Sequence, residues 1–550
     1  MGEDFGGYHC AICRDDAYKE RARQTAERNR RTAERNREKA LDSERFQRRY
    51  DEMQVRQRAQ EEQYNDARQT KEAREEAARV KITLRIGVFF DGTGNNPFNV
   101  EMGRKCGAHH PVSAQDMDGS CKPYMQDPDS SYGGEVTNVK RLHDLYRASI
   151  DQEKIIQQKK AFDKVYVEGI GTTAGGQDRV LLGMALGRGE TGIEARVFDA
   201  FGQVKQRLRN FHERFPDIQI SSLIFDIFGF SRGAAAARHF ACLCLARTGS
   251  PLRETLSLPD RLFARGFSKV FGEGVNTGFI GLFDTVASVG GLSNLGYVRS
   301  PTTPGVKLYL MPQYFPNVLQ LVARDEYRAN FALNRVGPDH PEISLPGVHS
   351  DIGGGYRDEI EECVLLSPMQ ALEVGQFTDV KTTSIYRDAQ RERAKWHAKG
   401  WQLDMLELVT PDPVKLLPEP REQNAPKQKR VFVGLQLRRK IGAGLSRVYL
   451  RVMYEAAKKH GIEFDDLQED PELAPPADLQ PLCERFVAGD YRITPAEEQL
   501  LKLHYIHQSA HWNPTFLSGP RTTTFELAYA HVPTADAVRV HHPHVPEWTL

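Results

Sequence analysis

The sequence predicts an α/β fold with a mainly parallel sheet, a long N-terminal helical arm and a mostly helical C-terminal addition. Strand-like apolar runs alternate with helix-compatible segments between residues 81 and 360, as in parallel sheets whose strands are joined by helices. Ahead of them, from Arg14 to Val80, there is no glycine and no proline, which is typical of a long solvated helix. Beyond residue 360 the pattern loosens. We therefore divide the chain into residues 1–80, 81–360 and 361–550.

The arm, residues 1–80, is dominated by Glu, Arg, Gln, Ala and Lys. It contains a short repeat with the heptad period, "TAERNRR" followed by "TAERNRE", but few large apolar residues occupy the repeat. A coiled coil buries apolar residues at two positions of each heptad, so a solvated helix is favoured over a strong zipper. If this solvated helix has a function of its own, the expected function is to bind a partner.

Composition and charge limit the classes of partner and the cellular route. Lys and Arg together number 74, as do Asp and Glu, so the formal net charge is zero and nothing favours nucleic acid as a partner. No run approaches the roughly 18 apolar residues that span a bilayer, and the first residues, "MGEDFGGYHC", do not form a secretion signal. We expect synthesis in the cytoplasm without a signal peptide. Cys106 and Cys121 share one loop-like region, and an oxidising compartment would allow them to pair.

The catalytic-sized domain, residues 81–360, opens with a strand-like run. "VKITLRIGVFFDGTGNN" is rich in β-branched and aromatic residues and stops at glycines, so it predicts a buried strand that ends in a tight loop. Three more runs predict strands, and an amphipathic segment between them predicts a helix. The strands are expected at Asp163–Gly171, Ile218–Phe230 and Thr277–Ser288, and the helix at Gly192–Phe215.

The C-terminal addition, residues 361–550, is predicted to be partly helical and to pack on the core or face a membrane. Gln390 to Lys399 and Arg447 to His460 have helical patterns, whereas Pro411 to Lys427 is proline-rich and linker-like.

The pentapeptide Gly229-Phe230-Ser231-Arg232-Gly233 makes Ser231 the candidate nucleophile. A strand-like run leads straight into it, and Ala234 to Ala246 supplies a helix directly after it, which is the strand–turn–helix setting of a nucleophile elbow. The glycines fit because the turn is strained and neighbouring backbones pass close by. The pentapeptide alone is a weak signal, since a small residue at a tight turn satisfies it equally well.

A serine hydroxyl is a poor nucleophile at neutral pH, so it needs a base and an orienting acid. Asp284, in "GLFDTVAS", follows a strand-like run, and His349, in "LPGVHSDIGGGY", lies in a glycine-rich loop. Each alone is more commonly a turn or solvated loop residue, but the order serine, acid, histidine is the one that this architecture uses. Asp351 is the alternative acid, and His511 is the alternative base.

The oxyanion that forms during ester attack needs two convergent donors. One is expected from the N–H of Arg232, which follows the nucleophile, and the other from the "DGTGNN" loop, where Gly92 exposes its backbone and Thr93 adds a hydroxyl. The plain interpretations of this loop are a glycine turn or a phosphate nest. The loop lacks the pattern of a nucleotide P-loop, so nucleotide binding is not expected.

Four segments in this order resemble one family: "IGVFFDGTGNN", "FGFSRGAAAAR", "GLFDTVASVG" and "GVHSDIGGGY". They are similar to the α/β-hydrolase phospholipase effectors of the bacterial type VI secretion system, in the first class of its Gly-x-Ser-x-Gly lipases. The segments fall between Ile86 and Tyr356, and the later "IHQSAHWNP" is similar to the family's C-terminal part. The N-terminal arm is not matched, so its role stays open.

The resemblance implies an α/β-hydrolase-like core in which Ser231 is the nucleophile, Asp284 the acid and His349 the base, with Gly92 and Thr93 lining the oxyanion hole. It implies hydrolysis of acyl esters in membrane glycerophospholipids, of the phospholipase A1 or A2 type. It also implies docking on the secretion spike protein VgrG, action in the periplasm of target bacteria, and a cognate immunity protein in the producer. This chemistry needs neither a metal nor a cofactor.

Three alternative functions stay open at the level of the sequence. A soluble carboxylesterase would use the same residues on small esters. A phospholipase C-like enzyme or phosphatase would need metal ligands from acidic and histidine clusters. A non-enzymatic adaptor would act through the arm, with the core as a scaffold.

Overall fold

The computed structural model describes residues 11–113, 115–178, 192–246, 249–287, 305–416, 426–467, 470–514 and 531–546. The chain divides into two compact units, Met1–Arg79 and Val80–Leu550. A further division of the second unit at residue 360 stays a prediction.

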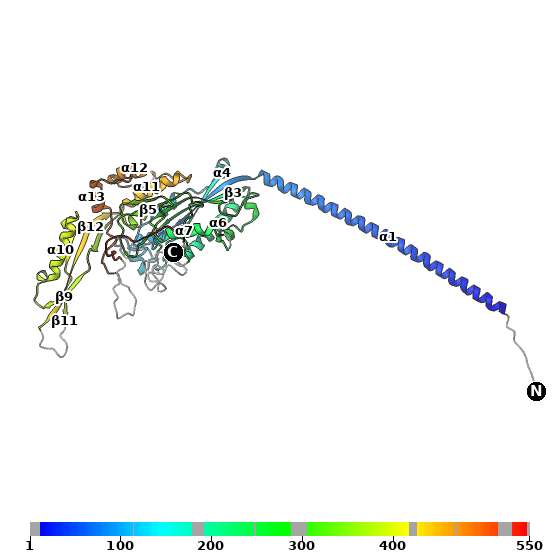
Figure 1. Cartoon of the computed structure of the whole chain (residues 1–550), viewed down its shortest axis with the longest axis horizontal. Coiled ribbons are helices and arrows are strands. Elements are labelled where there is room, and N and C mark those ends of the chain that lie inside the picture. The colour runs from blue at the N-terminus through cyan, green and yellow to red at the C-terminus, as the bar shows by residue number, and fades with distance from the viewer. Residues whose placement is uncertain are drawn as a thin grey trace, which may run out of the picture. The chain divides into compact units, whose positions relative to one another are not determined.

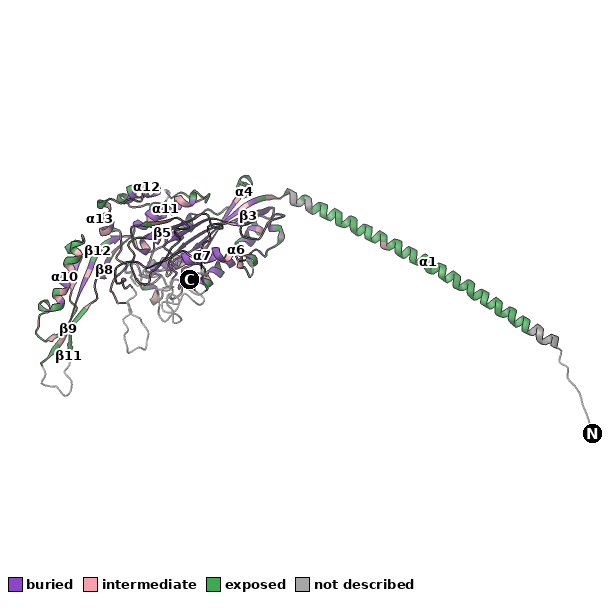
Figure 2. Ribbon diagram, in the orientation of Figure 1, coloured by how far each residue is buried: buried purple, intermediate pink, exposed green. Residues whose placement is uncertain are grey.

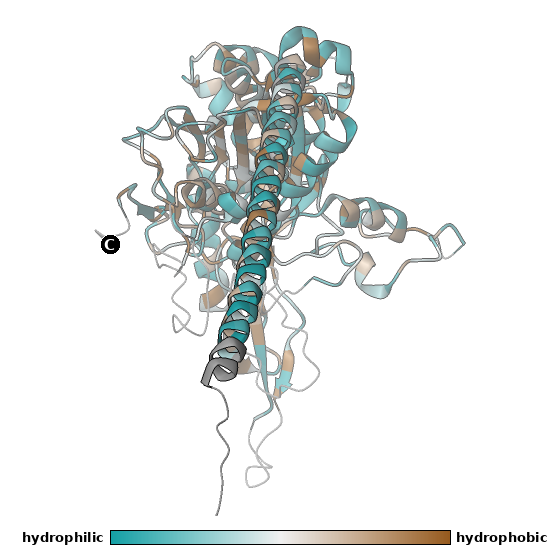
Figure 3. Cartoon of the chain, turned by 90° about the vertical axis from the view of Figure 1, so that its right-hand side faces the viewer, coloured by the Kyte–Doolittle hydropathy of each residue, from teal (hydrophilic) through white to brown (hydrophobic). Residues whose placement is uncertain are grey.

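The described part of the first unit is one long helix, α1 (Ala11–Ala78), of 68 residues. Its described side chains are almost all exposed (Figure 2), and hydrophilic residues occupy nearly its whole length (Figure 3). The few large apolar side chains that it carries, such as Phe46 and Tyr64, are exposed as well. The prediction of a long solvated helix is therefore confirmed.

The second unit is built on a six-stranded sheet in which every pair of neighbouring strands is parallel (Figure 1). The strand order is β2-β1-β3-β4-β5-β7. The strands are β1 (Val80–Phe90), β2 (Lys160–Val167), β3 (Ile218–Phe230), β4 (Val275–Phe283), β5 (Val318–Ala323) and β7 (Glu342–Leu345). The predicted parallel α/β sheet is confirmed: β1 and β3 lie in the runs that predicted them, and β2 and β4 overlap theirs but begin two or three residues earlier.

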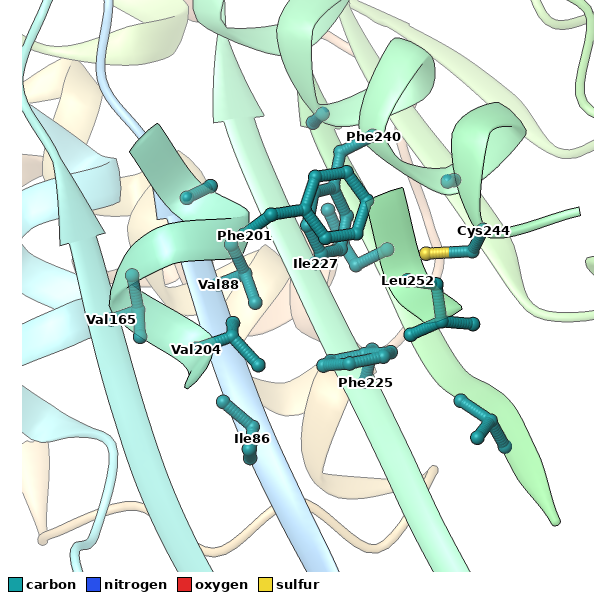
Figure 4. Close-up of a cluster of buried hydrophobic side chains, with 14 of the residues drawn as sticks. Ile86, Val88, Val165, Phe201, Val204, Phe225, Ile227, Phe240, Cys244 and Leu252 are labelled. Atoms are coloured by element: carbon teal, nitrogen blue, oxygen red, sulfur yellow. The ribbon is translucent and has the colours of Figure 1, made fainter. Parts of the chain in front are cut away.

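Helices cover both faces of this sheet. One face packs against α6 (Ile193–Arg214) and α7 (Arg232–Cys244), and the other against α3 (Asn138–Leu145) and α11 (Leu445–Lys458). Side chains alternate along a strand, so Ile86 and Val88 of β1 join Phe201 and Phe240 on the first face (Figure 4), while Phe89 joins the second. Because α11 belongs to the second layer, residues beyond 360 share the core of the sheet.

The C-terminal addition contains a five-stranded antiparallel sheet that the sequence analysis missed. Its central strand is β12 (Gln428–Gly442), which pairs with all four others. These are β8 (Glu359–Leu365), β9 (Gln370–Gly375), β10 (Leu406–Val409) and β11 (Val414–Leu416). β11 lies inside the segment that was interpreted as a linker, so the addition mixes strands with helices. The missed signal was the alternation in "VFVGLQL", where Val431, Val433 and Leu435 are buried.

The predicted helices of the addition are present as α10 (Ser384–Ala398) and α11, followed by α12 (Gln480–Val487) and α13 (Pro495–His504). Upstream, Cys106 ends α2 (Pro97–Cys106) and forms a disulfide with Cys121. Within the described ranges, no helix combines the length and apolar character that crossing a membrane requires.

Candidate active site

Ser231 occupies a sharp turn between β3 and α7. Its φ of 59° and ψ of −125° define a backbone conformation that persists only where the surroundings impose it. The two glycines of the pentapeptide allow the close packing: a Cβ on Gly229 would lie 2.5 Å from the carbonyl oxygen of Gly233, and one on Gly233 would lie 2.3 Å from that of Asp91. The strand–turn–helix elbow expected from the sequence is present, with the serine at its tip.

Asp284 follows the adjacent strand at the same level of the sheet. The parallel strands β3 and β4 pair Phe230 with Phe283, so Ser231 and Asp284 are the next residue on each. The N–H of Ser231 donates to the carbonyl of Phe283 at 3.0 Å. Carboxyl ends of parallel strands are where α/β folds place their ligand sites, and this edge carries both residues.

His349 reaches the same edge as the first residue of α9 (His349–Gly353), which follows β7. Its Nδ1 lies 2.5 Å from Oδ2 of Asp284. Its backbone N–H donates to Glu326, and its ring packs on those of Phe230 and Phe331, with centroids 4.6 and 4.8 Å away. The structure therefore joins the acid and the base that the sequence proposed.

No hydrogen bond joins Ser231 to this pair. Among the described residues, neither Oγ of Ser231 nor Nε2 of His349 has a hydrogen-bond partner. The serine and the imidazole are connected through Phe230, which precedes the serine and packs on the histidine ring. Hydrogen bonds between nucleophile and base are often long in enzymes without substrate. The missing bond is therefore compatible with a serine hydroxyl and an imidazole that meet when substrate is bound.

Burial and one guanidinium set the charges of the pair. Burial alone would raise the pKa of Asp284, but the Arg539 guanidinium and His349 outweigh it and hold that pKa well below its usual range. Burial also lowers the pKa of His349 despite the neighbouring carboxylate. The imidazole is therefore neutral near pH 7, the state in which its Nε2 accepts a proton.

The loop after β1 supplies the second side of the candidate oxyanion hole. Gly92 already donates its N–H to Oδ1 of Asp91 at 2.7 Å. Thr93 differs, because neither its N–H nor its buried hydroxyl has a partner among the described residues. The N–H of Arg232 belongs to the first turn of α7, whose donors find no acceptor within the helix. Of the two loop residues, Thr93 is thus the better donor.

The alternative acid and base make other contacts. Asp351 accepts from Nδ1 of His507 at 2.7 Å. His511 accepts the N–H of Asn513 at 3.2 Å, and burial lowers its pKa to about 4. Both residues bond to partners other than Asp284 and His349, which bond to each other at the sheet edge that carries Ser231, so Asp284 and His349 stay the leading candidates.

Two charged side chains at the site were missed by sequence reasoning. Arg539 binds both oxygens of Asp284, at 2.7 and 2.8 Å. Glu326 is fully buried, binds Arg328 and accepts the backbone N–H of His349. No motif marks either residue, because the contacts that bring them to the site are made with Asp284, 255 residues before Arg539, and with His349, 23 residues after Glu326. Within the described part of the chain, no cluster of three His, Cys, Asp or Glu side chains is arranged to hold a metal ion.

Comparison with known proteins gives two strong matches. A family model described as the catalytic domain of Tle1-like type VI secretion phospholipase effectors matches residues 253–373, a range that contains Asp284 and His349. The structure of the Tle1 effector bound to the VgrG spike from the type 6 secretion system matches with a TM-score of 0.64 and 28% identity, over 84% of this chain and 94% of that chain.

Weaker similarities add no argument. An uncharacterized protein from Pseudomonas aeruginosa is 22% identical with a TM-score of 0.28, over 54% of this chain and 44% of that chain. An arylesterase is 12% identical with a TM-score of 0.17, over 50% of this chain and 69% of its own. The search of curated proteins gave no match. The two strong matches show that this chain is similar to the Tle1-like phospholipase effectors of the type VI secretion system, in its fold and in the segment that carries Asp284 and His349.

Proposed function

We propose that the chain hydrolyses acyl ester bonds of membrane glycerophospholipids, as a phospholipase A with Ser231, Asp284 and His349 as its catalytic residues. The observation that carries this proposal is the 2.5 Å contact between His349 and Asp284 at the sheet edge where Ser231 sits in its strained turn. The family supplies the substrate class, because its members are phospholipase effectors.

In the first half of the reaction, Nε2 of His349 takes the proton of Ser231 while Oγ attacks the ester carbonyl carbon. Asp284 holds Nδ1 protonated, so that Nε2 is the basic nitrogen, and stabilises the imidazolium that forms. The N–H of Arg232 donates to the developing oxyanion, together with the donors of Thr93, which have no partner among the described residues. His349 then protonates the leaving lysophospholipid oxygen, which leaves an acyl group on the serine.

In the second half, His349 removes a proton from water, which attacks the acyl carbonyl and releases the fatty acid. The proton returns to Oγ of Ser231 as the acyl–oxygen bond breaks. All of these steps use the one histidine, whose ring is fixed between Phe230 and Phe331.

The delivery route follows from the family. The Tle1 effector of the similar structure is bound to a VgrG spike, and we extend that partner to this chain, together with a cognate immunity protein in the producer and action in the periplasm of target bacteria. Size-exclusion chromatography of the full chain with VgrG from the same bacterium tests the docking. Co-elution supports it, and separate elution at micromolar concentrations contradicts it.

Mass spectrometry of the lipid products tests the reaction. Wild-type protein added to vesicles of phosphatidylethanolamine and phosphatidylglycerol is expected to release fatty acid and lysophospholipid. Ser231→Ala should lose roughly 10³-fold or more of this activity without unfolding, whereas Ser257→Ala, at an exposed serine, should keep it. Using lipids with different sn-1 and sn-2 chains, the same spectra assign the acyl position.

The remaining alternatives predict other results. A carboxylesterase would act on short p-nitrophenyl esters and leave vesicle lipids intact. An adaptor would keep its cellular phenotype with Ser231→Ala. Activity that survives Ser231→Ala but is lost in EDTA would point to a metal-dependent enzyme instead.

A further inference from the structure

The carboxylate of Asp284 is occupied by four donors, two on each oxygen. Oδ1 accepts the N–H of Ala323 at 2.9 Å and Nη1 of Arg539 at 2.7 Å. Oδ2 accepts Nη2 of Arg539 at 2.8 Å and lies 2.5 Å from Nδ1 of His349. A carboxylate offers about four acceptor positions, so this one is saturated and is aimed at the imidazole in a single orientation.

Arg539 comes from the C-terminal segment, which is fixed on both sides of it. Its Nε donates to the carbonyl of Phe331 at 2.8 Å. Directly after it, β13 (His541–His542) pairs in parallel with β6 (Leu333–Asn334). His544 then accepts the N–H of Leu310 at 3.0 Å and contacts Asp339 at 2.8 Å. The side chain of Arg539 is 4% exposed and that of Asp284 0%, so water has little access to the pair.

The charges around His349 come from three elements. Asp284 follows β4, Glu326 and Arg328 follow β5, and Arg539 reaches the site through Asp284. On its own helix, Asp351 is engaged by His507. Among the described residues, two carboxylates and two guanidinium groups lie around the imidazole, so their formal charges balance. Loss of the Arg539 charge would leave a net negative charge beside the imidazole, which favours its protonated form.

We propose that Arg539 is a positioning residue for the reaction, which fixes the direction of Asp284 and keeps His349 available as a neutral base. This inference rests on the proposed function, because it assigns Asp284 and His349 their roles in hydrolysis. The guanidinium acts in two separable ways. Its charge sets the pH at which His349 loses its proton, and its two-pronged geometry sets where the carboxylate points.

The experiment is the pH profile of hydrolysis for Arg539→Gln and Arg539→Lys in the full chain, with phospholipid vesicles as substrate. In Arg539→Gln, the acidic side of the pH profile of kcat is expected to shift to higher pH by on the order of one pH unit, because a nearby unit charge is removed. The value of kcat is also expected to fall. In Arg539→Lys the positive charge remains, but the two-pronged guanidinium geometry is lost. The acidic side of the pH profile should therefore stay close to that of the wild type, while kcat falls at least ten-fold.

Arg335→Gln is the matched control, because Arg335 pairs with Glu342 and bonds the same C-terminal segment through its backbone. Arg335→Gln should leave both kcat and the acidic side of the pH profile unchanged. The inference is overturned if Arg539→Gln is folded and the acidic side of its pH profile does not shift, since a merely structural arginine would lower kcat equally at every pH. It is also overturned if Arg539→Lys keeps kcat within two-fold of the wild type, a result that decides the matter even if the Gln variant does not fold.

Failure of this inference differs from failure of the proposed function. If Ser231→Ala abolishes hydrolysis and the Arg539 variants behave like the wild type, only the role of Arg539 is wrong. If Ser231→Ala remains active, the proposed function itself is wrong, whatever the Arg539 variants do.

Discussion

Ser231 and Asp284 end two adjacent parallel strands in register, and both leave their strand with a positive φ, of 59° and 47°. Few residues other than glycine adopt this conformation without support from their surroundings. The support here is mutual, because the N–H of Ser231 bonds to the carbonyl of Phe283, directly before Asp284, and the N–H of Val286 bonds to the carbonyl of Ser231. The nucleophile and the acid are thus held by one hydrogen-bonded turn.

Asp284→Asn should lower kcat by roughly 10³-fold or more with little change in KM, because the amide no longer selects the reactive imidazole tautomer. Asp351→Asn is the comparison, since Asp351 bonds His507 rather than His349. It should lose stability but keep most of its turnover. Steady-state kinetics of both variants on vesicles decides the matter, and the reverse ranking would move the acid role to Asp351.

Gly233→Ala should disrupt the elbow, because a Cβ there would meet carbonyl oxygens of the β1 end at 2.3 and 2.4 Å. We expect a loss of roughly 1–3 kcal/mol in the free energy of unfolding and a large loss of turnover. Gly202→Ala, in the exposed surface of α6 where a Cβ meets nothing within 4 Å, should instead add up to about 1 kcal/mol. Urea titrations measure both, and equal stabilities would contradict the steric argument.

Thr93→Val should separate catalysis from stability. The buried hydroxyl of Thr93 has no partner among the described residues, so removing it should not lower the free energy of unfolding, yet turnover should fall roughly 10²-fold if the hydroxyl serves the oxyanion. Thr172→Val is the mirror control, because its buried hydroxyl donates to the carbonyl of Gly169. That variant should lose about 1 kcal/mol and little turnover. Unchanged kcat in Thr93→Val would exclude its hydroxyl as a donor.

Asp91 makes stability depend on pH. Burial raises its pKa to about 6, although hydrogen bonds from Thr137, Tyr166 and Gly92 oppose the rise. A carboxyl group whose folded pKa is raised stabilises the fold fully at low pH and loses that contribution as pH rises through the folded value. Relative to wild type, Asp91→Asn should therefore gain up to about 3 kcal/mol between pH 4 and pH 7.

The measurement for Asp91 is urea unfolding at several pH values, with Asp129→Asn at an exposed carboxylate as the control. The difference in the free energy of unfolding between variant and wild type should change with pH for Asp91→Asn and should stay constant for Asp129→Asn. Parallel curves for all three proteins would show that Asp91 does not titrate in this range.

Local patterns predicted the parts of the fold that depend on local sequence. β1 and β3 are rich in β-branched and aromatic residues and are buried over most of their length, as strands of a parallel sheet are, and the elbow has its own signature in the two glycines around Ser231. The long helix α1 followed directly from a stretch without glycine or proline. The meeting of Asp284 with His349 was also predicted, because this architecture uses the order serine, acid, histidine.

Features that depend on distant contacts escaped prediction. Arg539 lies 255 residues from Asp284, and only folding shows that the two meet. The central strand β12 was missed because its partners are short and are scattered along the preceding segment, from Glu359 to Leu416. The engagement of Gly92 by Asp91 is a detail of one loop conformation, which no composition or spacing specifies.

Labelling with a fluorophosphonate probe tests the central claim most directly, because the probe reacts covalently with activated serine nucleophiles. After reaction of the full chain at pH 7.5, digestion and mass spectrometry should place the adduct on the peptide that contains Ser231. The labelling should be strongly slowed in Asp284→Asn and absent in Ser231→Ala. An adduct on another residue, or undiminished labelling of Ser231→Ala, would contradict the assignment of Ser231 as the nucleophile.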